Sequence, residues 1–197
     1  GTKSYDEVLD KIVAFQKEKN LTFISGRGWD QNDWEIKEFP TKEKLDKLFP
    51  TIPVAVGRVD GHALLVNQAA IDLSGITKDT KISGGEIILK NGKMTGILID
   101  SAMDFIKFPE TSSQAAKKGL LEAQKISFSY GLTTVDDAGL DRNTIELIDD
   151  LQESNELKIR VYAMVSADNQ AQIDYYIKKG ITKTNRLHVR SFKVYGD

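Results

Sequence analysis

The stretch Pro53-Val54-Ala55-Val56-Gly57-Arg58-Val59-Asp60-Gly61-His62 decides the fold that we expect. Its apolar first half predicts a buried strand over 53–58, and its second half brings an arginine, a carboxylate, a glycine and an imidazole together. The apolar residues that follow predict a helix over 62–74, which Gly75 would end. A strand, a polar cluster and a helix in this order are typical of α/β proteins, which present polar groups at the carboxyl ends of strands.

The cluster supplies three candidate substrate-binding residues, Arg58, Asp60 and His62. Each also has a structural interpretation. His62 fits equally a residue at a helix start whose imidazole satisfies a backbone group, and Asp60 fits a partner for Arg58. Asn67 falls inside the expected helix, about one turn from His62, so the two could share a helix face.

Upstream of this stretch, Ser4-Tyr5-Asp6-Glu7 is a capping-box pattern that predicts an amphipathic helix over 4–19. A short strand is expected over 21–25, and Gly26-Arg27-Gly28-Trp29-Asp30 then predicts a tight loop. Trp29 is a candidate substrate contact, and the alternative is an aromatic anchor for the loop. A short helix is expected over 41–49.

Downstream, residues 84–99 predict a two-stranded hairpin on the Asn91-Gly92 turn. A hairpin interrupts a regular alternation of strands and helices, so we interpret residues of about 77–110 as an insertion. A short helix is expected over 101–108 and a longer one over 112–130.

The last third of the chain is regular. Strands expected over 132–135, 159–164 and 187–195 start about 28 residues apart, and helices over 142–153 and 168–179 fill the gaps. This pattern indicates parallel strands joined by right-handed crossovers. It fits a doubly wound sheet and part of a (β/α)₈ barrel equally, and the pattern alone does not separate them.

Composition excludes several classes of function. The 197 residues carry 27 basic and 29 acidic side chains, a net charge of −2, so we expect no nucleic-acid partner. No apolar run approaches the roughly 18–20 residues that span a bilayer, and we expect no membrane segment. The chain has no cysteine and two histidines, so any metal site depends on Asp, Glu or a modified lysine. The cytoplasm is the favoured compartment, with export after loss of a signal peptide as the alternative.

Five stretches together resemble the YtcJ-like branch of the amidohydrolase superfamily, amidohydrolase family 3. They are residues 26–30, 53–67, 84–96, 131–137 and 192–197. Each is short, but their shared order and spacing extend across nearly the whole chain. The resemblance implies an α/β fold, namely one partial (β/α)₈ TIM barrel domain over 1–197 of the metal-dependent hydrolase type, with the β-hairpin as an insertion.

The resemblance also implies an activity. It is the hydrolysis of a carbon–nitrogen bond, in a small amide or formamide, by water activated on a divalent metal, commonly zinc. In that superfamily a lysine on the fourth barrel strand can be carbamylated and then bridges two metals. Lys193 matches that position and is the expected metal-binding and catalytic residue. Alternation within its strand places Lys193 with Ser191, whereas Phe192 and His188 share the opposite parity.

The sequence departs from the family pattern at the metal site. The His-x-His pair of the first barrel strand is absent and would be expected upstream of Gly1, and the later metal histidines would follow Asp197. We therefore expect an internal piece of the barrel that is inactive alone and does not fully coordinate a metal. Because an incomplete barrel has open strand edges, a homodimer is expected.

Asp136 and Asp137 are expected to end a strand, a favoured catalytic place in a barrel, and Asp137 is therefore a candidate substrate-binding residue. The alternative is an ordinary turn-forming aspartate. A second interpretation of the whole chain is a non-catalytic α/β domain whose cluster at Arg58–His62 binds a small polar ligand.

Overall fold

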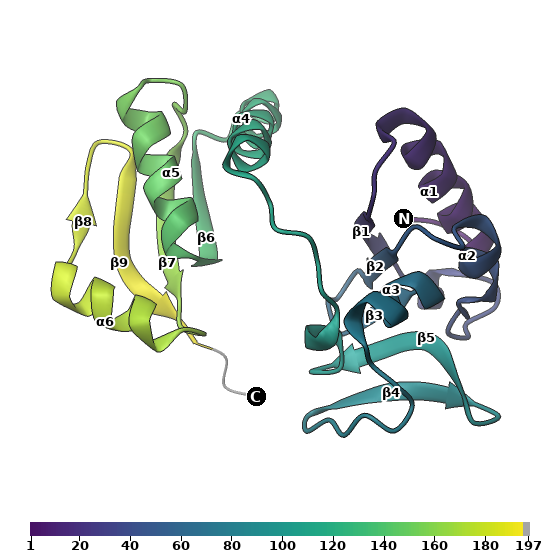
Figure 1. Ribbon diagram of the computed structural model, residues 1–197. Coiled ribbons are helices and arrows are strands. Elements are labelled where there is room, and N and C mark those ends of the chain that lie inside the picture. Colours follow the sequence, from purple (N-terminus) through teal and green to yellow (C-terminus); the bar gives the residue numbers. More distant parts are fainter. Residues whose placement is uncertain (195–197) are drawn as a thin grey trace. The chain divides into compact units, whose positions relative to one another are not determined.

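A computed structural model describes residues 1–194 of the chain, and Tyr195, Gly196 and Asp197 lie outside this description. The chain divides into two compact units, Gly1–Pro109 and a second unit that begins at Glu110. Each unit has its own sheet and its own core (Figure 1).

The first unit is built around a five-stranded mixed sheet with the strand order β1-β2-β3-β5-β4. Strands β1 and β2 are parallel, and the other neighbouring strands are antiparallel. The elements are α1 (Tyr5–Lys19), β1 (Ile24–Trp29), η1 (Gln31–Asp33), α2 (Glu43–Leu48), β2 (Val54–Arg58), β3 (Ala63–Val66), α3 (Gln68–Ser74), β4 (Gly85–Lys90), β5 (Lys93–Asp100) and η2 (Met103–Phe105).

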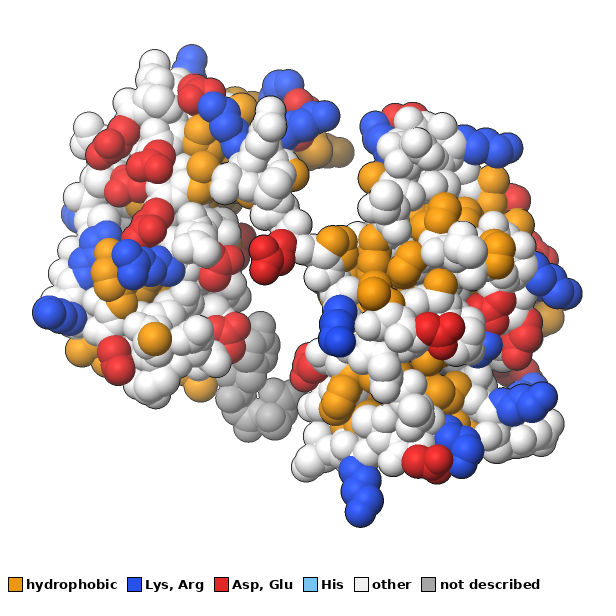
Figure 2. Space-filling model, in the orientation of Figure 1, with side chains coloured by type: hydrophobic (Ala, Val, Ile, Leu, Met, Phe, Trp, Pro, Cys, Tyr) orange, Lys and Arg blue, Asp and Glu red, His pale blue; other side chains and the backbone are white. Residues whose placement is uncertain are grey.

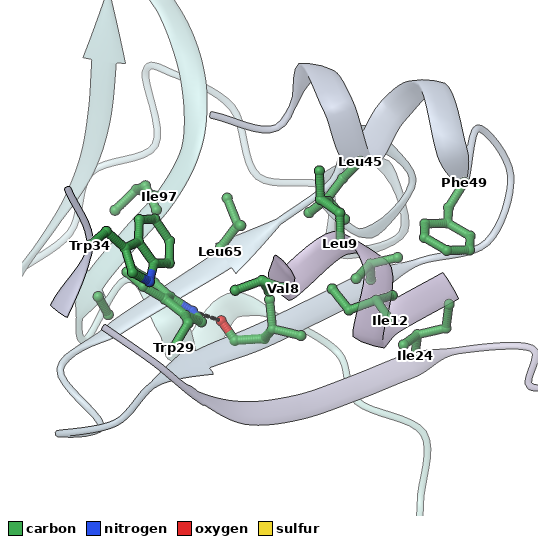
Figure 3. Close-up of a cluster of buried hydrophobic side chains, with 13 residues drawn as sticks. Val8, Leu9, Ile12, Ile24, Trp29, Trp34, Leu45, Phe49, Leu65 and Ile97 are labelled. Atoms are coloured by element: carbon green, nitrogen blue, oxygen red, sulfur yellow. Dashed lines mark hydrogen bonds between the residues drawn. The ribbon is translucent and has the colours of Figure 1, made fainter. Parts of the chain in front are cut away.

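Both faces are covered at the centre of this sheet, because β2 sends alternate side chains to two separate cores. Val54 and Val56 lie in a cluster with the apolar face of α1 (Figure 3). Ala55 lies on the other face, in a cluster that includes Ala70 and Ile71 of α3. The expected helix over 4–19 and strand over 53–58 are thus confirmed, and the Ser4 hydroxyl caps α1 by accepting from the Glu7 backbone N–H at 3.2 Å.

The expected helix over 62–74 is wrong in its first half. Ala63–Val66 forms strand β3, which runs antiparallel to β2 and to β5, and the helix begins only after Asn67. All four residues of β3 are buried because the strand is central in the sheet and covered on both faces. A short continuous apolar run of this kind fits a buried strand as well as a buried helix.

The expected loop over 26–30 is also wrong, because β1 continues to Trp29. Its pairing with β2 shifts at Gly28, where the chain inserts one extra residue at a φ of 113°. This β-bulge reverses the alternation of side chains, so Trp29 points into the same core as Ile24 and Val56. Glycine suits the bulge because few other residues adopt such a φ.

The hairpin expected over 84–99 is confirmed as β4 and β5, joined at Asn91 and Gly92, which have φ values of 52° and 72°. Such positive values at both central residues are those of a tight hairpin turn. The hairpin is part of the five-stranded sheet, because β5 pairs with β3. The helix expected over 101–108 is reduced to the short η2.

The second unit contains a four-stranded sheet with the order β6-β7-β9-β8, in which β6, β7 and β9 are parallel. The strands expected over 159–164 and 187–195 and the intervening helices are confirmed, apart from position 195, which lies outside the described residues. The strand expected over 132–135 begins later and continues to Leu140, and the short antiparallel β8 was not expected. The elements are α4 (Ser113–Ser129), β6 (Thr134–Leu140), α5 (Arg142–Glu153), β7 (Arg160–Ser166), α6 (Gln170–Lys179), β8 (Thr182–Lys183) and β9 (Leu187–Lys193).

Helices α5 and α6 pack on the same face of this sheet (Figure 1). Ile148 of α5 and Tyr176 of α6 share one core with Val161, Ala163 and Val165 of β7. A doubly wound sheet carries helices on both faces, and strand–helix units of a barrel carry them on one. The chain is thus a mixed α/β protein, and neither sheet closes on itself within residues 1–194.

Candidate functional site

The Arg58–His62 loop joins the antiparallel strands β2 and β3. Arg58 and Asp60 form a two-point ion pair, with distances of 2.9 Å from Nε to Oδ1 and 2.7 Å from Nη2 to Oδ2. The backbone N–H of His62 also donates to Asp60 Oδ1, at 3.1 Å. The hydrogen bond from Arg58 is the main reason why the pKa of Asp60 lies below its ordinary value.

Further contacts involve the backbone of the loop. Gly61 turns the chain at a φ of 85°, and the Arg27 guanidinium donates to the carbonyl oxygen of Val59 at 2.8 Å. The sequence left two alternatives open for Asp60. In the structure, Asp60 pairs with Arg58. The charge of Arg58 is therefore already shared with a carboxylate.

His62 is paired with a residue that the sequence analysis missed. Its Nδ1 lies 2.7 Å from Oδ1 of Asp100, the last residue of β5. The two residues are 38 positions apart, and they meet only because β3 lies beside β5 in the sheet. No local signal in the sequence marks Asp100.

A cavity of about 450 Å³ borders the Arg58–His62 loop. This volume is in the range of small-molecule sites, which are mostly apolar with a few polar groups. The polar part comes from Arg27, Arg58 and Asp104. The apolar wall comes largely from the segment that follows β5, with Met103, Ile106 and Phe108.

Trp29 lies in the core, with a relative exposure of 3%. Its indole N–H donates to the carbonyl oxygen of Val56 at 2.7 Å (Figure 3), and its ring packs near those of Trp34 and Phe39. These contacts are those of an aromatic anchor. A substrate contact for Trp29 stays a prediction.

In the second unit, the sheet face opposite the helices carries polar side chains, and we call it the Tyr162 face. Tyr162 and Met164 of β7 lie on it, opposite His188 and Ser191 of β9. The Tyr162 hydroxyl lies 3.0 Å from the Ser191 hydroxyl, and the Tyr162 ring meets the His188 ring edge to face. Lys193 follows on the same face, in register with Ser166.

The expected parity of His188 was wrong because β9 contains a β-bulge. Ala163 pairs with Val189, and the next residue of β7, Met164, pairs with Ser191, so Arg190 is the extra residue. The bulge reverses the alternation, and His188 therefore lies on the face of Lys193 and not on that of Phe192. The predicted placement of Lys193 with Ser191 is confirmed.

Asp136 and Asp137 lie in the middle of β6, which continues to Leu140, so the expectation that they end a strand is wrong. Asp136 is in register with Tyr162, whereas Asp137 is in register with Ala163 and so belongs to the opposite face. Both aspartates are exposed because β6 is an edge strand.

The described residues do not make a complete metal centre. Within residues 1–194, no three His, Cys, Asp or Glu side chains converge as a group that could hold a metal ion. Lys193 is half-buried on the Tyr162 face, and it alone does not supply the three or more ligands that a catalytic metal needs.

On the face drawn in Figure 2, Lys and Arg side chains lie among Asp and Glu side chains and form no extended basic surface. Within residues 1–194, no helix combines the length and the apolar character needed to cross a membrane.

Comparison with known proteins identifies relatives of the chain. It is 36% identical over 137 residues to YtcJ of Bacillus subtilis (strain 168), whose name places it among the amidohydrolases; the match covers 66% of this chain and 26% of YtcJ. It is 29% identical over 153 residues to the N-substituted formamide deformylase of Arthrobacter pascens, covering 72% of this chain and 28% of that protein. The chain thus spans about a quarter of the length of these relatives.

The fold has a counterpart among solved structures. An uncharacterised metal-dependent hydrolase from Pyrococcus horikoshii OT3 matches 98% of this chain and 37% of its own, with a TM-score of 0.68 and 22% sequence identity. A sequence model of a protein family, described as "Amidohydrolase family", matches residues 1–197, the full length of the sequence. The chain therefore belongs to the amidohydrolase family.

Proposed function

We propose that the intact protein hydrolyses the carbon–nitrogen bond of a small amide or formamide with the help of a divalent metal, zinc in the first instance. The observation that carries this proposal is the family match over residues 1–197. Relatives named amidohydrolase and formamide deformylase support the reaction class. The partial (β/α)₈ barrel expected from the sequence stays part of this proposal, and the one-sided packing of α5 and α6 supports it.

Lys193 is the residue that we assign to the metal in the intact protein. The bulge at Arg190 directs it to the Tyr162 face, away from the apolar core of the second unit. The polar side chains of Tyr162, His188 and Ser191 on this face support the assignment, whereas the neighbouring Phe192 belongs to the core side. The remaining metal ligands would come from outside the described residues, so the chain alone is proposed to be inactive.

The test measures formate release from N-benzylformamide by the intact protein and by its Lys193→Ala variant. Loss of Lys193 should lower kcat by more than the roughly 10–100-fold that removal of a ligand's hydrogen-bond partner costs. The matched control is Lys183→Ala, which removes a lysine from the short strand β8. Equal rates for the two variants, or metal-dependent hydrolysis by the 197-residue chain alone, would contradict the proposal.

A second candidate function is a small-ligand-binding domain without catalysis. The cavity of about 450 Å³ beside the Arg58–His62 loop favours it, because Arg27 and Arg58 suit a polar ligand. Treatment of the intact protein with a metal chelator distinguishes the two candidate functions. Removal of metal should abolish hydrolysis under the first proposal, whereas binding at the cavity should persist under the second.

We also propose that the chain forms a homodimer. The edge strands β1 and β6 each pair on one side only within the described sheets, and unpaired edges favour association with another chain. Small-angle scattering over a concentration series tests this. A monomeric mass at every concentration would overturn the proposal.

A further inference from the structure

We propose that the cavity beside the Arg58–His62 loop binds a small monocarboxylate, with the carboxylate on the Arg27 guanidinium and an apolar body over Gly57. The inference rests on the second candidate function, small-ligand binding at this cavity, and it names the chemical class of the ligand. All the residues involved belong to the first unit, and Arg27 and Gly57 both line the cavity.

Arg27 brings a positive charge to the cavity. Its Nη2 donates to the carbonyl oxygen of Val59 at 2.8 Å, and no Asp or Glu side chain within residues 1–194 forms an ion pair with it. A guanidinium has five N–H groups, so most of those of Arg27 remain for a ligand. They form a planar fork that binds both oxygens of a carboxylate, which makes a carboxylate the matching anion.

Two glycines of the cavity lie against the side chain of Arg27. A Cβ built on Gly57 would lie 3.6 Å from Cγ of Arg27, and one built on Gly61 would lie 3.4 Å from its Nη2. The stem of Arg27 therefore passes beside Gly57, and the guanidinium ends beside Gly61 and the Val59 carbonyl. A cation that is placed in this way loses less conformational entropy on binding than one on an unsupported side chain.

The second arginine of the cavity, Arg58, is already paired with a carboxylate. Its Nε and Nη2 bind the two oxygens of Asp60 at 2.9 Å and 2.7 Å, and its guanidinium lies 5.5 Å from the centroid of the Phe39 ring. Another carboxylate would have to compete with Asp60 for these donors. Arg27 is therefore the anion-binding group of the cavity.

Gly57 points to a ligand independently of the charges. It lies in β2, where glycine costs stability because it has no side chain to pack and loses the most freedom on folding. Its φ is outside the left-handed region, and the three atoms nearest to a Cβ at this position would lie at ordinary contact distances of 3.6, 3.8 and 3.9 Å. Neither the backbone nor the packing thus requires glycine here. A glycine of this kind marks a place where a ligand approaches the strand closely.

The rest of the lining determines the shape and charge of the ligand. Met103, Ile106 and Phe108 supply an apolar surface, and the volume of about 450 Å³ is in the range of small-molecule sites. Asp104 also lines the cavity, and its charge would repel a second negative group. The ligand class is therefore an apolar molecule that carries a single carboxylate.

The first experiment compares three probes that share a phenylpropyl body and differ in charge: 3-phenylpropanoate, the neutral 3-phenylpropan-1-ol and the dianion benzylmalonate. In ¹⁵N–¹H spectra of the full chain at pH 8, 3-phenylpropanoate should shift the amide signals of Gly57 and Gly61. Its dissociation constant should be lower than that of the alcohol by at least about tenfold, the contribution of a hydrogen bond between charged groups. Benzylmalonate should bind more weakly than 3-phenylpropanoate.

Two variants test the assigned contacts. Arg27→Met keeps the apolar stem of an exposed side chain, so the fold is retained. It should weaken binding of 3-phenylpropanoate by at least about tenfold and leave that of the alcohol within about twofold. Gly57→Ala suits the backbone and should weaken binding of both probes, because its methyl group occupies the place of the apolar body. The matched controls Arg190→Met and Gly119→Ala lie in the second unit and should leave the affinities unchanged.

The outcomes separate this inference from the second candidate function. An unchanged affinity for 3-phenylpropanoate in Arg27→Met, or equal affinities of the wild type for the acid and the alcohol, would overturn the carboxylate assignment, whereas shifts at Gly57 would still support small-ligand binding. Tighter binding of benzylmalonate than of 3-phenylpropanoate would overturn the single charge. If none of the three probes shifts the signals of Gly57 and Gly61, the second candidate function fails as well, independently of any hydrolysis by the intact protein.

Discussion

The hydroxyl groups of Tyr162 and Ser191 lie 3.0 Å apart on one face of the second sheet. Regular alternation along β9 would place Ser191 on the face opposite His188, yet both lie beside Tyr162. The bulge at Arg190 produces this arrangement and also brings Lys193 to the Tyr162 face.

Deletion of Arg190 should therefore remove the bulge without turning its neighbours. Val189 and Ser191 would become consecutive and keep their partners Ala163 and Met164, so Ser191 and Lys193 would stay on the Tyr162 face. The free energy of unfolding in urea denaturation should change by less than about 1 kcal/mol, and Arg190→Ala, which keeps the bulge, should stay within about 0.5 kcal/mol of the wild type. A loss of about 3–5 kcal/mol on deletion, the cost of an unpaired buried charge, would show that Lys193 turns into the core and that Arg190 is not the extra residue.

Two tyrosines in the second unit should respond in opposite ways to loss of the hydroxyl. Tyr162→Phe removes the hydrogen bond to Ser191 and should destabilise the protein by about 1 kcal/mol. The buried hydroxyl of Tyr176 has no hydrogen-bond partner among residues 1–194, so Tyr176→Phe should be neutral or stabilising by up to about 1 kcal/mol. Urea denaturation at pH 7 measures both, and a larger loss for Tyr176→Phe would contradict the assignment of these contacts.

Tyr176 also predicts a pH dependence. Burial raises the pKa of its hydroxyl to about 12, above the value of about 10 of an unfolded chain. The neutral form is thus favoured in the folded state, and this contribution to stability is complete below pH 10 and is lost as the pH rises to 12. In the Tyr176→Phe variant, the free energy of unfolding should fall less steeply between pH 10 and pH 12 than in the wild type. The same slope in wild type and variant would show that another group controls alkaline unfolding.

The sequence predicted the elements that have a clear period or cap. The helix over 4–19 has a capping box, and the Asn91-Gly92 pair marks a hairpin, and both are present. Ala63–Val66 was misassigned because four consecutive apolar residues carry no period. Whether such a run becomes a strand depends on the sheet on either side of it, which is a tertiary property.

The candidate site was predicted only in part, because its geometry depends on long-range contacts. Arg58, Asp60 and His62 are adjacent in sequence and form one loop. Asp100 reaches His62 through the pairing of β3 with β5, which no local pattern indicates. The β-bulge at Arg190 likewise has no sequence signature, since arginine does not require a special φ.

Among the amide side chains of the first unit, we expect substitution of Asn67 to lower the stability most. It is completely buried, its Oδ1 accepts from the backbone N–H groups of Val54 and Ala70, and its Nδ2 donates to the carbonyl oxygens of Phe49 and Ile52. Asn67→Asp removes both donors and places a charge there, so the free energy of unfolding should fall by at least about 3 kcal/mol.

The control for Asn67 is Asn169, which caps α6 by accepting from backbone N–H groups at an exposed position. Asn169→Asp keeps that capping function and should change stability by less than about 0.5 kcal/mol. Thermal unfolding followed by circular dichroism compares the two variants. A similar loss for both would show that the donors of Asn67 are not important.

Replacement of two glycines by alanine should change the stability in opposite directions. Gly119 lies inside α4, and a Cβ built there meets no atom within 4 Å, so Gly119→Ala should raise stability by about 0.5–1 kcal/mol through helix propensity. Gly96 in β5 has a φ of 91°, and its Cβ would lie 2.4 Å from the carbonyl oxygen of Val66. Gly96→Ala must shift β3 or β5 and should cost more than about 2 kcal/mol. Urea denaturation of both variants tests these expectations. If Gly96→Ala does not lower the free energy of unfolding, β3 and β5 do not approach each other at Gly96 as closely as the structure shows.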